Sequence, residues 1–329
     1  MKVAHGVDTI TLPMPWELET VNVHLVELGD SVSNAVSGGF MLVDSGIGTP
    51  ESFDALAAAL EERGIQWSNI RMLLLTHLHP DHIGLSWKLL ELTGAKLLMH
   101  RTEVEYLNLV SREQLAPFFT TAMKNAGVPA DMQSKMDHAM RDVRRQFRPH
   151  QPHWILEGGE IIPVRGGSLQ AIWTPGHSPG HVCLYSPEHR YLISGDHILE
   201  FITPNIGWHP EKDMLAEYLS SLALLTPFDV DLVIPSHGGP FRDHRRRIRE
   251  TTDHHAERCG EILKHISVEP LTANGLVERV WPRKLSAFHH HFAVFEILAH
   301  LEYMSRRGEI ASEARNGGAL YWSPSEARP

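Results

Sequence analysis

Residues 76–82 carry four side chains that can bind a metal ion: His77, His79, Asp81 and His82. They directly follow the apolar run 72–75, which is typical of a strand buried on both faces. Side chains on a tight turn at the end of such a strand can diverge towards two neighbouring ions. A lone histidine is more often a structural residue than a ligand. The close spacing of these four groups instead favours a metal site.

Three further loops hold metal-competent side chains, and each also follows a predicted strand. His177 lies in the Pro- and Gly-rich loop 174–181, where the turn residues shape the backbone that presents it. Asp196 and His237 each lie just after a short apolar run. A carboxylate such as Asp196 can bridge two cations and hold them ~3.5–4 Å apart. The loops together predict a two-metal cluster.

These four loops, in this order and in this strand context, resemble the metallo-β-lactamase superfamily, and within it the glyoxalase II-like hydrolases. The resemblance covers about residues 10–240. It implies an α/β fold of four layers, the αββα sandwich, in which two mixed sheets lie between layers of helices.

The resemblance also implies a role for each candidate residue. One ion is expected on His77, His79 and His177, the other on Asp81, His82 and His237, with Asp196 bridging both. Asp44 matches the first acidic position of the family, and we expect it to hydrogen-bond a ligand or its loop, because metal-bound imidazoles usually need a partner on the other ring nitrogen. His181 and His197 are left out, because seven ligands already complete the implied set.

The implied ligand set combines five imidazoles and two carboxylates with no thiolate. Such nitrogen and oxygen donors suit zinc and also accept iron or manganese. The two cysteines, Cys183 and Cys259, stand in no metal-ligand spacing and are expected to be buried thiols. We therefore expect two divalent metal ions per chain, with zinc as the preferred metal.

The expected reaction is hydrolysis of a thioester, or of a lactone or other ester, in a small-molecule substrate. A water shared by two divalent ions has its pKa lowered from ~15.7 to near neutrality, so it can attack a carbonyl as hydroxide. The resemblance implies that Asp81 orients this hydroxide and is thus the catalytic residue. The alternative is a two-metal phosphodiesterase or ribonuclease, because nucleases of the superfamily use the same cluster.

Two other activities agree less well with the sequence. Antibiotic-degrading β-lactamases of the superfamily generally lack the bridging carboxylate that Asp196 supplies. An iron-dependent oxidoreductase with a flavin partner would need a flavodoxin-like unit, but no phosphate-binding loop follows a strand beyond residue 250.

The strands and helices that must position the loops are predicted from the periodicity of apolar residues. Strands are predicted at 21–28, 39–43, 72–75, 96–99, 161–164, 169–173, 182–185, 191–194 and 232–234. Between them, a helix is expected to begin after Thr49 and to stop at Gly64, and another is expected over 84–92. This alternation of strands and helices indicates a layered α/β architecture.

The chain is expected to contain two units, since 329 residues are long for one core. Residues 1–245 form the predicted catalytic domain, with a helical insertion or lid at about 101–150. Residues 246–329 form a mostly helical, winged-helix-like domain, with a long helix over 288–307 and a hairpin turn at Asn316, Gly317 and Gly318.

Charge and hydropathy limit the class of partner. The net charge is −10, and residues 250–329 contain eleven Asp and Glu against nine Lys and Arg, so a nucleic-acid partner is not expected. No apolar run approaches the ~20 residues of a membrane span, and the N-terminus has no apolar leader. We therefore predict a cytoplasmic protein without a membrane partner, and a homodimer stays open.

Two segments outside the four loops have alternative interpretations. The basic run from Arg242 to Arg249 is interpreted as a solvated helix face in preference to an anchor for an anionic thiol carrier such as glutathione or coenzyme A. The apolar loop 198–208 either lines the substrate pocket or packs against the helical insertion, and the sequence favours neither.

Overall fold

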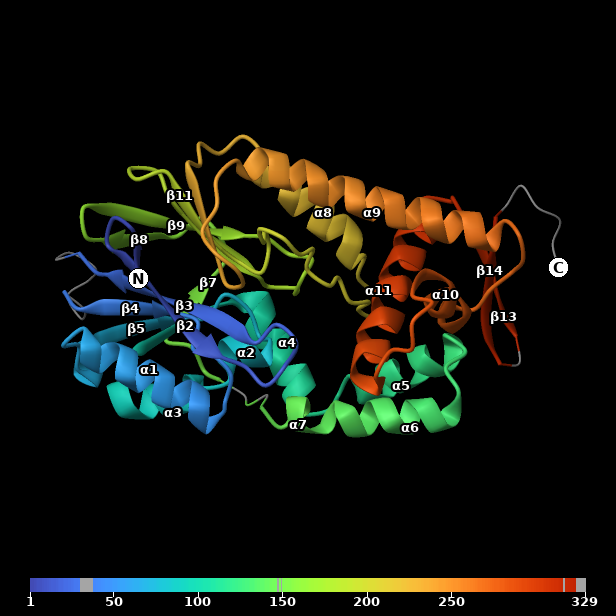
Figure 1. Cartoon of the computed structure of the whole chain (residues 1–329), viewed down its shortest axis with the longest axis horizontal. Coiled ribbons are helices and arrows are strands. Elements are labelled where there is room, and N and C mark those ends of the chain that lie inside the picture. The colour runs from blue at the N-terminus through green and yellow to red at the C-terminus, as the bar shows by residue number, and fades with distance from the viewer. Residues whose placement is uncertain (30–37, 147, 149, 316, 324–329) are drawn as a thin grey trace.

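A computed structural model describes residues 1–29, 38–146, 148, 150–315 and 317–323 of the chain. Figure 1 shows two parts: the strands of two sheets on the left, and a helical part with a small hairpin on the right. None of the helices in the described part of the chain is long and apolar enough to cross a membrane.

The first sheet has seven strands that follow one another in chain order. They are β1 (Lys2–Ala4), β2 (Val7–Pro13), β3 (Thr20–Glu27), β4 (Phe40–Val43), β5 (Ile70–Leu74), β6 (Lys96–His100) and β7 (Trp154–Leu156). Strands β1 to β4 pair antiparallel, whereas β4 to β7 pair parallel. The sheet is therefore mixed, as predicted.

The second sheet has five strands in the order β12-β11-β10-β9-β8. They are β8 (Ile161–Val164), β9 (Gly167–Trp173), β10 (Val182–Ser186), β11 (Tyr191–Gly195) and β12 (Leu232–Pro235). Only β11 and β12 pair parallel. Because β10 runs antiparallel to both β9 and β11, β9, β11 and β12 all point the same way, and the loops that follow them leave one edge of the sheet.

Helices cover the outer face of each sheet. The first sheet is covered by α1 (Pro50–Glu62), α3 (Ser86–Thr93) and α4 (Arg101–Ser111), and the second by α8 (Met214–Leu225) and the start of α9 (His244–Ile266). Helix α1 begins as expected, because the Thr49 side chain accepts a hydrogen bond from Ser52 N at 3.2 Å and Pro50 occupies the first turn.

Strand β5 shows why the predicted strand 72–75 is apolar throughout. Met72 and Leu74 face the core between the two sheets, while Leu73 and Leu75 face the core under the helices. Side chains alternate along a strand, so a strand buried on both faces needs apolar residues at every position. The predicted αββα sandwich is confirmed.

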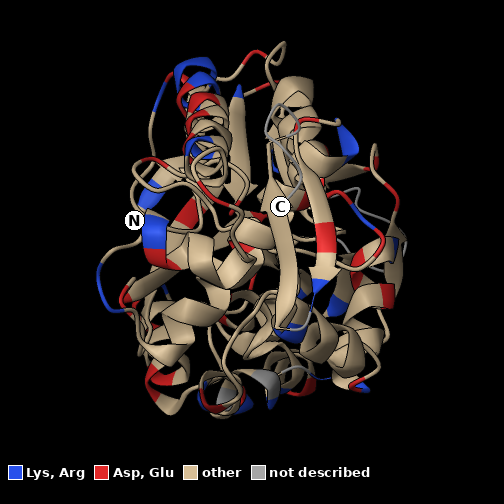
Figure 2. Ribbon diagram, turned by 90° about the vertical axis from the view of Figure 1, so that its right-hand side faces the viewer, with Lys and Arg blue, Asp and Glu red and all other residues tan. Residues whose placement is uncertain are grey.

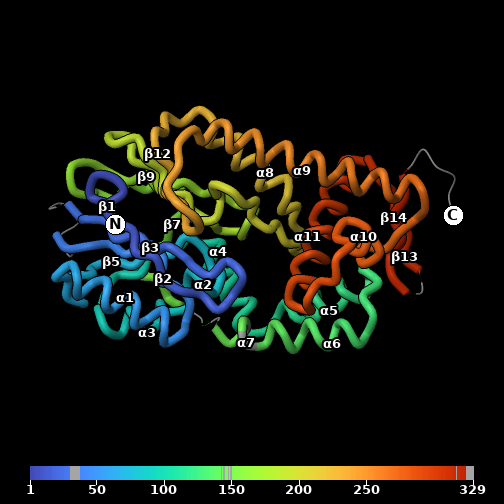
Figure 3. The backbone as a smooth tube through the Cα atoms, in the orientation of Figure 1, coloured from blue at the N-terminus to red at the C-terminus, as the bar shows by residue number. Residues whose placement is uncertain are grey.

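The right-hand part of Figure 1 has a hydrophobic core of its own. It contains α5 (Ala116–Asn125), α6 (Ala130–Ala139), α10 (Ala273–Val280), α11 (Ala287–Arg306) and the hairpin β13 (Ala311–Arg315) with β14 (Gly318–Trp322). Helices α5 and α6 come from the predicted insertion, and Figure 3 shows them beside α10 and α11. Those insertion helices therefore pack with C-terminal residues, while α4 packs on the first sheet.

Three short elements complete the fold: the 3-10 turn at Trp67–Asn69, α2 (Pro80–Ile83) and α7 (Arg141–Arg144). Helix α2 forms inside the histidine-rich segment, which was predicted to be a turn.

The predicted domain boundary at residue 245 falls in the first turn of α9, and the division into domains remains a prediction. Asn316 of the expected hairpin turn lies outside the described residues.

Two buried histidines link α9 to α11. His255 Nδ1 lies 3.2 Å from His300 Nε2, and His300 Nδ1 donates to the carbonyl of Glu296 at 2.8 Å. Burial lowers the pKa of His255 to about 3 and that of His300 to about 4. Both imidazoles are therefore neutral in the folded chain at pH values where an unfolded histidine becomes protonated.

This pair predicts that acid destabilises the fold. Protons bind the unfolded state below about pH 6.5, so each buried histidine removes about 1.4 kcal/mol of stability per pH unit as the pH falls towards 4. Between pH 7 and pH 5, the free energy of unfolding in urea should fall by about 2 kcal/mol less for His300→Gln than for the wild type. Exposed His138 provides the control, since His138→Gln should leave this pH dependence unchanged. An unaltered pH dependence in His300→Gln would contradict the prediction.

Candidate metal centre

The loops at one edge of the two sheets bring all seven predicted ligands together. They form three groups, and within each group one donor atom per residue lies within 4.8 Å of the others. The groups are His77, His79 and His177; His77, His82 and Asp196; and Asp81, His82 and His237. The donors converge because the strands that precede their loops all end at this edge.

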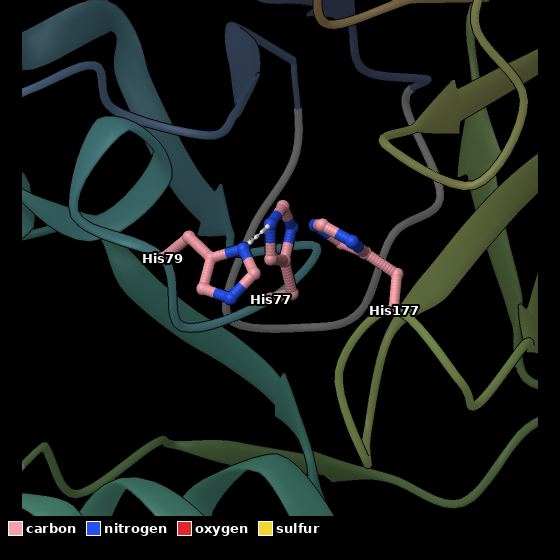
Figure 4. A group of neighbouring side chains, drawn as sticks. All are labelled: His77, His79 and His177. Carbon is pink, nitrogen blue, oxygen red and sulfur yellow. Dashed lines mark hydrogen bonds between the residues drawn. The ribbon is translucent and has the colours of Figure 1, made fainter. Parts of the chain in front are cut away.

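The first group joins two loops that come from different sheets. Figure 4 shows the rings of His77 and His79, which follow β5, and of His177, which follows β9, pointing towards one another. His77 Nε2 lies 3.0 Å from His79 Nδ1, and the rings of His77 and His177 have centroids 4.9 Å apart. One nitrogen atom of each of these three imidazoles therefore lies near the other two, as three ligands of a tetrahedral metal site do.

Asp196 lies at the centre of the whole cluster. Its Oδ2 is 3.4 Å from His82 Nε2 and 3.5 Å from both His177 Nε2 and His237 Nε2. Asp81 completes the other side, with Oδ2 at 3.3 Å from His237 Nε2. One carboxylate therefore touches ligands of both predicted ions, which is the position that a bridging group must occupy.

Several donor atoms in the cluster are buried without a hydrogen-bond partner. Among the described residues these include His82 Nε2, His177 Nε2 and Asp196 Oδ1. Buried polar atoms nearly always find a partner, because leaving one unsatisfied costs about 1–3 kcal/mol. Cations bound between these atoms would satisfy them, so the residues fit a metal centre.

The other ring nitrogen of each of four histidines is held by an acceptor. The pairs are His77 Nδ1 with Thr76 Oγ1 at 3.0 Å, His82 Nδ1 with Asp44 Oδ2 at 2.8 Å, His177 Nδ1 with Asn205 O at 2.9 Å and His237 Nδ1 with Thr20 O at 2.9 Å. An acceptor at Nδ1 turns Nε2, the atom that a cation would bind, towards the centre of the cluster. Two of these acceptors are backbone carbonyls, which the sequence cannot single out.

Asp44 is placed where it was expected, against a candidate ligand. It also accepts hydrogen bonds from Thr76 N and Thr76 Oγ1, each at 2.8 Å. Its φ of 62° lies in the left-handed region, which is uncommon for a residue other than glycine. A fully buried carboxylate in this conformation holds both the His82 ring and the start of the loop that carries His77.

His181 supports Asp196 rather than joining the candidate ligands. Its Nε2 accepts a hydrogen bond from Asp196 N at 3.2 Å, and its Nδ1 lies 2.8 Å from Thr174 Oγ1. With both ring nitrogens occupied, this imidazole has no lone pair to offer. His197 is buried beside Tyr218 and belongs to none of the three groups.

Glu103 joins the two loops that carry the first group, and its role is not evident in the sequence. This buried side chain on α4 accepts from Leu78 N and from Gly180 N, each at 2.6 Å. Burial raises the pKa of Glu103 to about 7, although these hydrogen bonds favour the ionised form. A Cβ on Gly180 would lie 2.3 Å from Glu103 N, so only glycine allows this close approach.

Charges within the cluster set the protonation of the donors. Burial would raise the pKa values of Asp81 and Asp196, but cationic His82 and His237 hold both below the ordinary range. In turn the two carboxylates outweigh burial and raise the pKa of His237 to about 10. Burial and neighbouring imidazoles lower the pKa of His77. Without bound cations, the raised pKa values of His82 and His237 favour their protonated forms, and bound cations would displace these protons.

Two arginines of the basic run from Arg242 to Arg249 donate to backbone carbonyls of the chain. Arg247 is buried and donates to Leu199 O at 2.6 Å and to Ile202 O at 2.7 Å. Arg245 donates to Thr226 O and Phe228 O, each at 2.9 Å. These guanidinium groups are occupied by carbonyls of the chain itself.

The loop 198–208 packs mainly under α8 and, of its described residues, only Trp208 meets the core that contains α5 and α6 of the predicted insertion. Ile198, Leu199 and Ile206 are buried in the fold, whereas the Phe201 side chain is 81% exposed. Because Asn205 O contacts His177, the loop lies directly beside the cluster.

Comparisons with family models match both parts of the chain. Residues 18–237 match the model described as the metallo-beta-lactamase superfamily. Residues 259–324 match the model of a metallo-beta-lactamase-like C-terminal domain. The first match contains all seven residues of the three groups.

Known proteins resemble this chain over most of its length. A probable metallo-hydrolase, YqjP of Bacillus subtilis, is 25% identical over 325 residues, which is 95% of this chain and 94% of that protein. The lactamase-like protein aptB of Emericella nidulans is 27% identical over 248 residues, and the match spans 60% of its length. The crystal structure of TTHA1429, a metallo-beta-lactamase family protein from Thermus thermophilus, superposes with a TM-score of 0.82 at 30% identity and covers 97% of this chain and 99% of that one.

The contacts of Glu103 generate a stability prediction. Glu103→Ala leaves the N–H groups of Leu78 and Gly180 without their acceptor, so the free energy of unfolding should fall by about 3 kcal/mol. Glu103→Gln should also destabilise, because one of its terminal groups can only donate. Exposed Glu105 on the same helix is the control, and Glu105→Ala should change stability by less than about 0.5 kcal/mol in urea unfolding. Equal stability of the two alanine variants would contradict this role.

Proposed function

We propose that this chain, which belongs to the metallo-beta-lactamase superfamily, is a metallo-hydrolase that uses two divalent ions to hydrolyse a thioester, or a lactone or other ester, in a small molecule. The observation that carries the proposal is the position of Asp196, whose Oδ2 lies within 3.5 Å of His177 Nε2, His82 Nε2 and His237 Nε2. A shared carboxylate between two sets of imidazoles supports a two-metal centre of the glyoxalase II-like kind.

The residues assigned to each ion follow the groups described above. His77, His79 and His177 would hold one ion, and Asp81, His82 and His237 the other. Zinc is the proposed metal, and iron or manganese would also accept this donor set. When bound, such ions lower the pKa of water and polarise a carbonyl oxygen.

Asp81 is the proposed catalytic residue. Its pKa is held below the ordinary range by His82 and His237, so the carboxylate stays ionised and can accept a hydrogen bond from the attacking water. Asp44 and His181 keep the His82 ring and the Asp196 backbone in place. The chain itself thus supplies a fixed acceptor for the water and a rigid frame for the donors.

Charge supports a small-molecule substrate over a nucleic acid. Figure 2 views the end of the molecule that carries the C-terminal helices, and acidic and basic residues are interspersed along its ribbons. A surface that binds a polyanion through its phosphates needs a continuous basic face. The arginines Arg245 and Arg247 of the basic run are already engaged by backbone carbonyls.

The C-terminal helices α10 and α11, followed by the hairpin β13–β14, have the order of a winged-helix-like unit. We propose this description for the segment, because two packed helices and a two-stranded wing share one hydrophobic core there.

The function is tested by metal analysis together with Asp81→Asn. The purified chain should contain about two metal ions, and Asp81→Asn should lower kcat/KM for a thioester or lactone at least about 100-fold. Exposed Asp54 on α1 is the control, since Asp54→Asn should keep wild-type activity. The substrates to compare are thioesters, lactones, a cephalosporin and bis-nitrophenyl phosphate.

Three outcomes would overturn the proposal. A chain that binds at most one ion has no two-metal centre. Full activity in Asp81→Asn removes the proposed catalytic residue. A dominant activity on the phosphate diester would replace the ester hydrolase with the phosphodiesterase.

A further inference from the structure

The acceptor for His177 belongs to a loop that the C-terminal part of the chain holds. His177 Nδ1 donates to Asn205 O at 2.9 Å, and the side chain of the same asparagine donates from Nδ2 to Glu296 Oε2 at 2.9 Å. Asn205 lies in the segment between β11 and α8, whereas Glu296 lies on α11. One residue therefore connects a candidate metal ligand to a helix of the C-terminal core.

We propose that Glu296 is a positioning residue, which acts through Asn205 to fix the orientation of the His177 imidazole. Helix α11 then sets the geometry of the ion site formed by His77, His79 and His177. The inference rests on the two-metal centre proposed above and extends it to a residue more than fifty positions beyond the last candidate ligand, His237.

Glu296 is itself held in place. Its side chain is 16% exposed, and its Oε1 lies 3.7 Å from Arg258 Nε. The Arg258 guanidinium stacks over the ring of Trp281 at 4.6 Å from the ring centroid and pairs with Glu261 at 2.8 Å. A carboxylate that is largely buried against such a supported cation has little freedom to move away from Asn205.

A second contact fixes the same loop to the same turn of α11. Trp208 N donates to Phe295 O at 3.0 Å, and the two rings stack with centroids 6.4 Å apart. Trp208 also packs against both the C-terminal core and the core under α8. The loop is thus tied to adjacent residues of α11 at two points, and Asn205 O is one of the groups that these ties hold.

His77, His82 and His237 do not depend on α11 in this way. The acceptors of His77 and His82 are Thr76 and Asp44, and His237 donates to Thr20 O. All three acceptors belong to the first sheet or to the loops that leave it. Loss of Glu296 should therefore weaken one ion site more than the other.

The test is competitive titration of the metal-free, full-length chain with Co²⁺ against a chromophoric chelator. Glu296→Ala should weaken one of the two Co²⁺ equivalents about tenfold, the scale of a lost outer-shell hydrogen bond, and change the visible spectrum of that equivalent. Glu296→Gln should bind within about twofold of the wild type, because its amide oxygen can still accept from Asn205. The melting temperature of the metal-free variants should stay close to that of the wild type.

Glu302 provides a matched control on the same helix. It pairs with Arg306 at 2.6 Å and makes no hydrogen bond to the loop among those described. Glu302→Ala should leave both Co²⁺ affinities and the spectrum unchanged.

The outcomes separate this inference from the proposed function. Unchanged Co²⁺ affinities in Glu296→Ala, or equal losses at both sites, would overturn the positioning role while leaving a two-metal centre intact. Equal impairment of Glu296→Gln and Glu296→Ala would also overturn it. A wild-type chain that binds fewer than two Co²⁺ would overturn the proposed function, and the inference with it.

Discussion

The buried carboxylate of Asp196 lies among imidazoles from three other loops, and the rest of the structure must hold these loops around it. Removing a carboxylate from water is unfavourable unless positive charge and hydrogen bonds surround it. His82, His177 and His237 approach its Oδ2, while His181 accepts from its backbone N–H. The loops can supply these partners only if the strands before them end at one edge, which is what the two packed sheets achieve.

Rigidity around the centre comes from buried polar groups that join one loop to another. Asp44 holds the ring of His82, and Glu103 ties the loop that begins at His77 to Gly180. Each of these side chains accepts more than one hydrogen bond, so its loss leaves several donors unpaired. Such a frame allows donors on separate strands to keep a fixed spacing before any ion binds.

The C-terminal part of the chain is joined to the sandwich through the loop beside the cluster. Asn205 and Trp208 contact α11, and Arg247 of α9 holds the carbonyls of Leu199 and Ile202. Helices α5 and α6 add to the same C-terminal core although they precede the second sheet in the chain. The catalytic edge is therefore bounded by residues from both matched regions of the sequence.

The sequence by itself determined nine of the twelve strands of the two sheets, the four strand-end loops and the seven candidate donors, because apolar periodicity and clustered histidines leave local patterns. Strands β1, β2 and β7 were not predicted. Helix α8 could also have been predicted from Asp213 as its cap and the spacing of its buried residues. Tertiary structure alone decided that Asn205 O orients His177, that His181 supports Asp196, and that α5 and α6 pack with α11. Backbone carbonyls have no identity in a sequence, and contacts between distant segments depend on how the layers pack, so no local pattern can specify them.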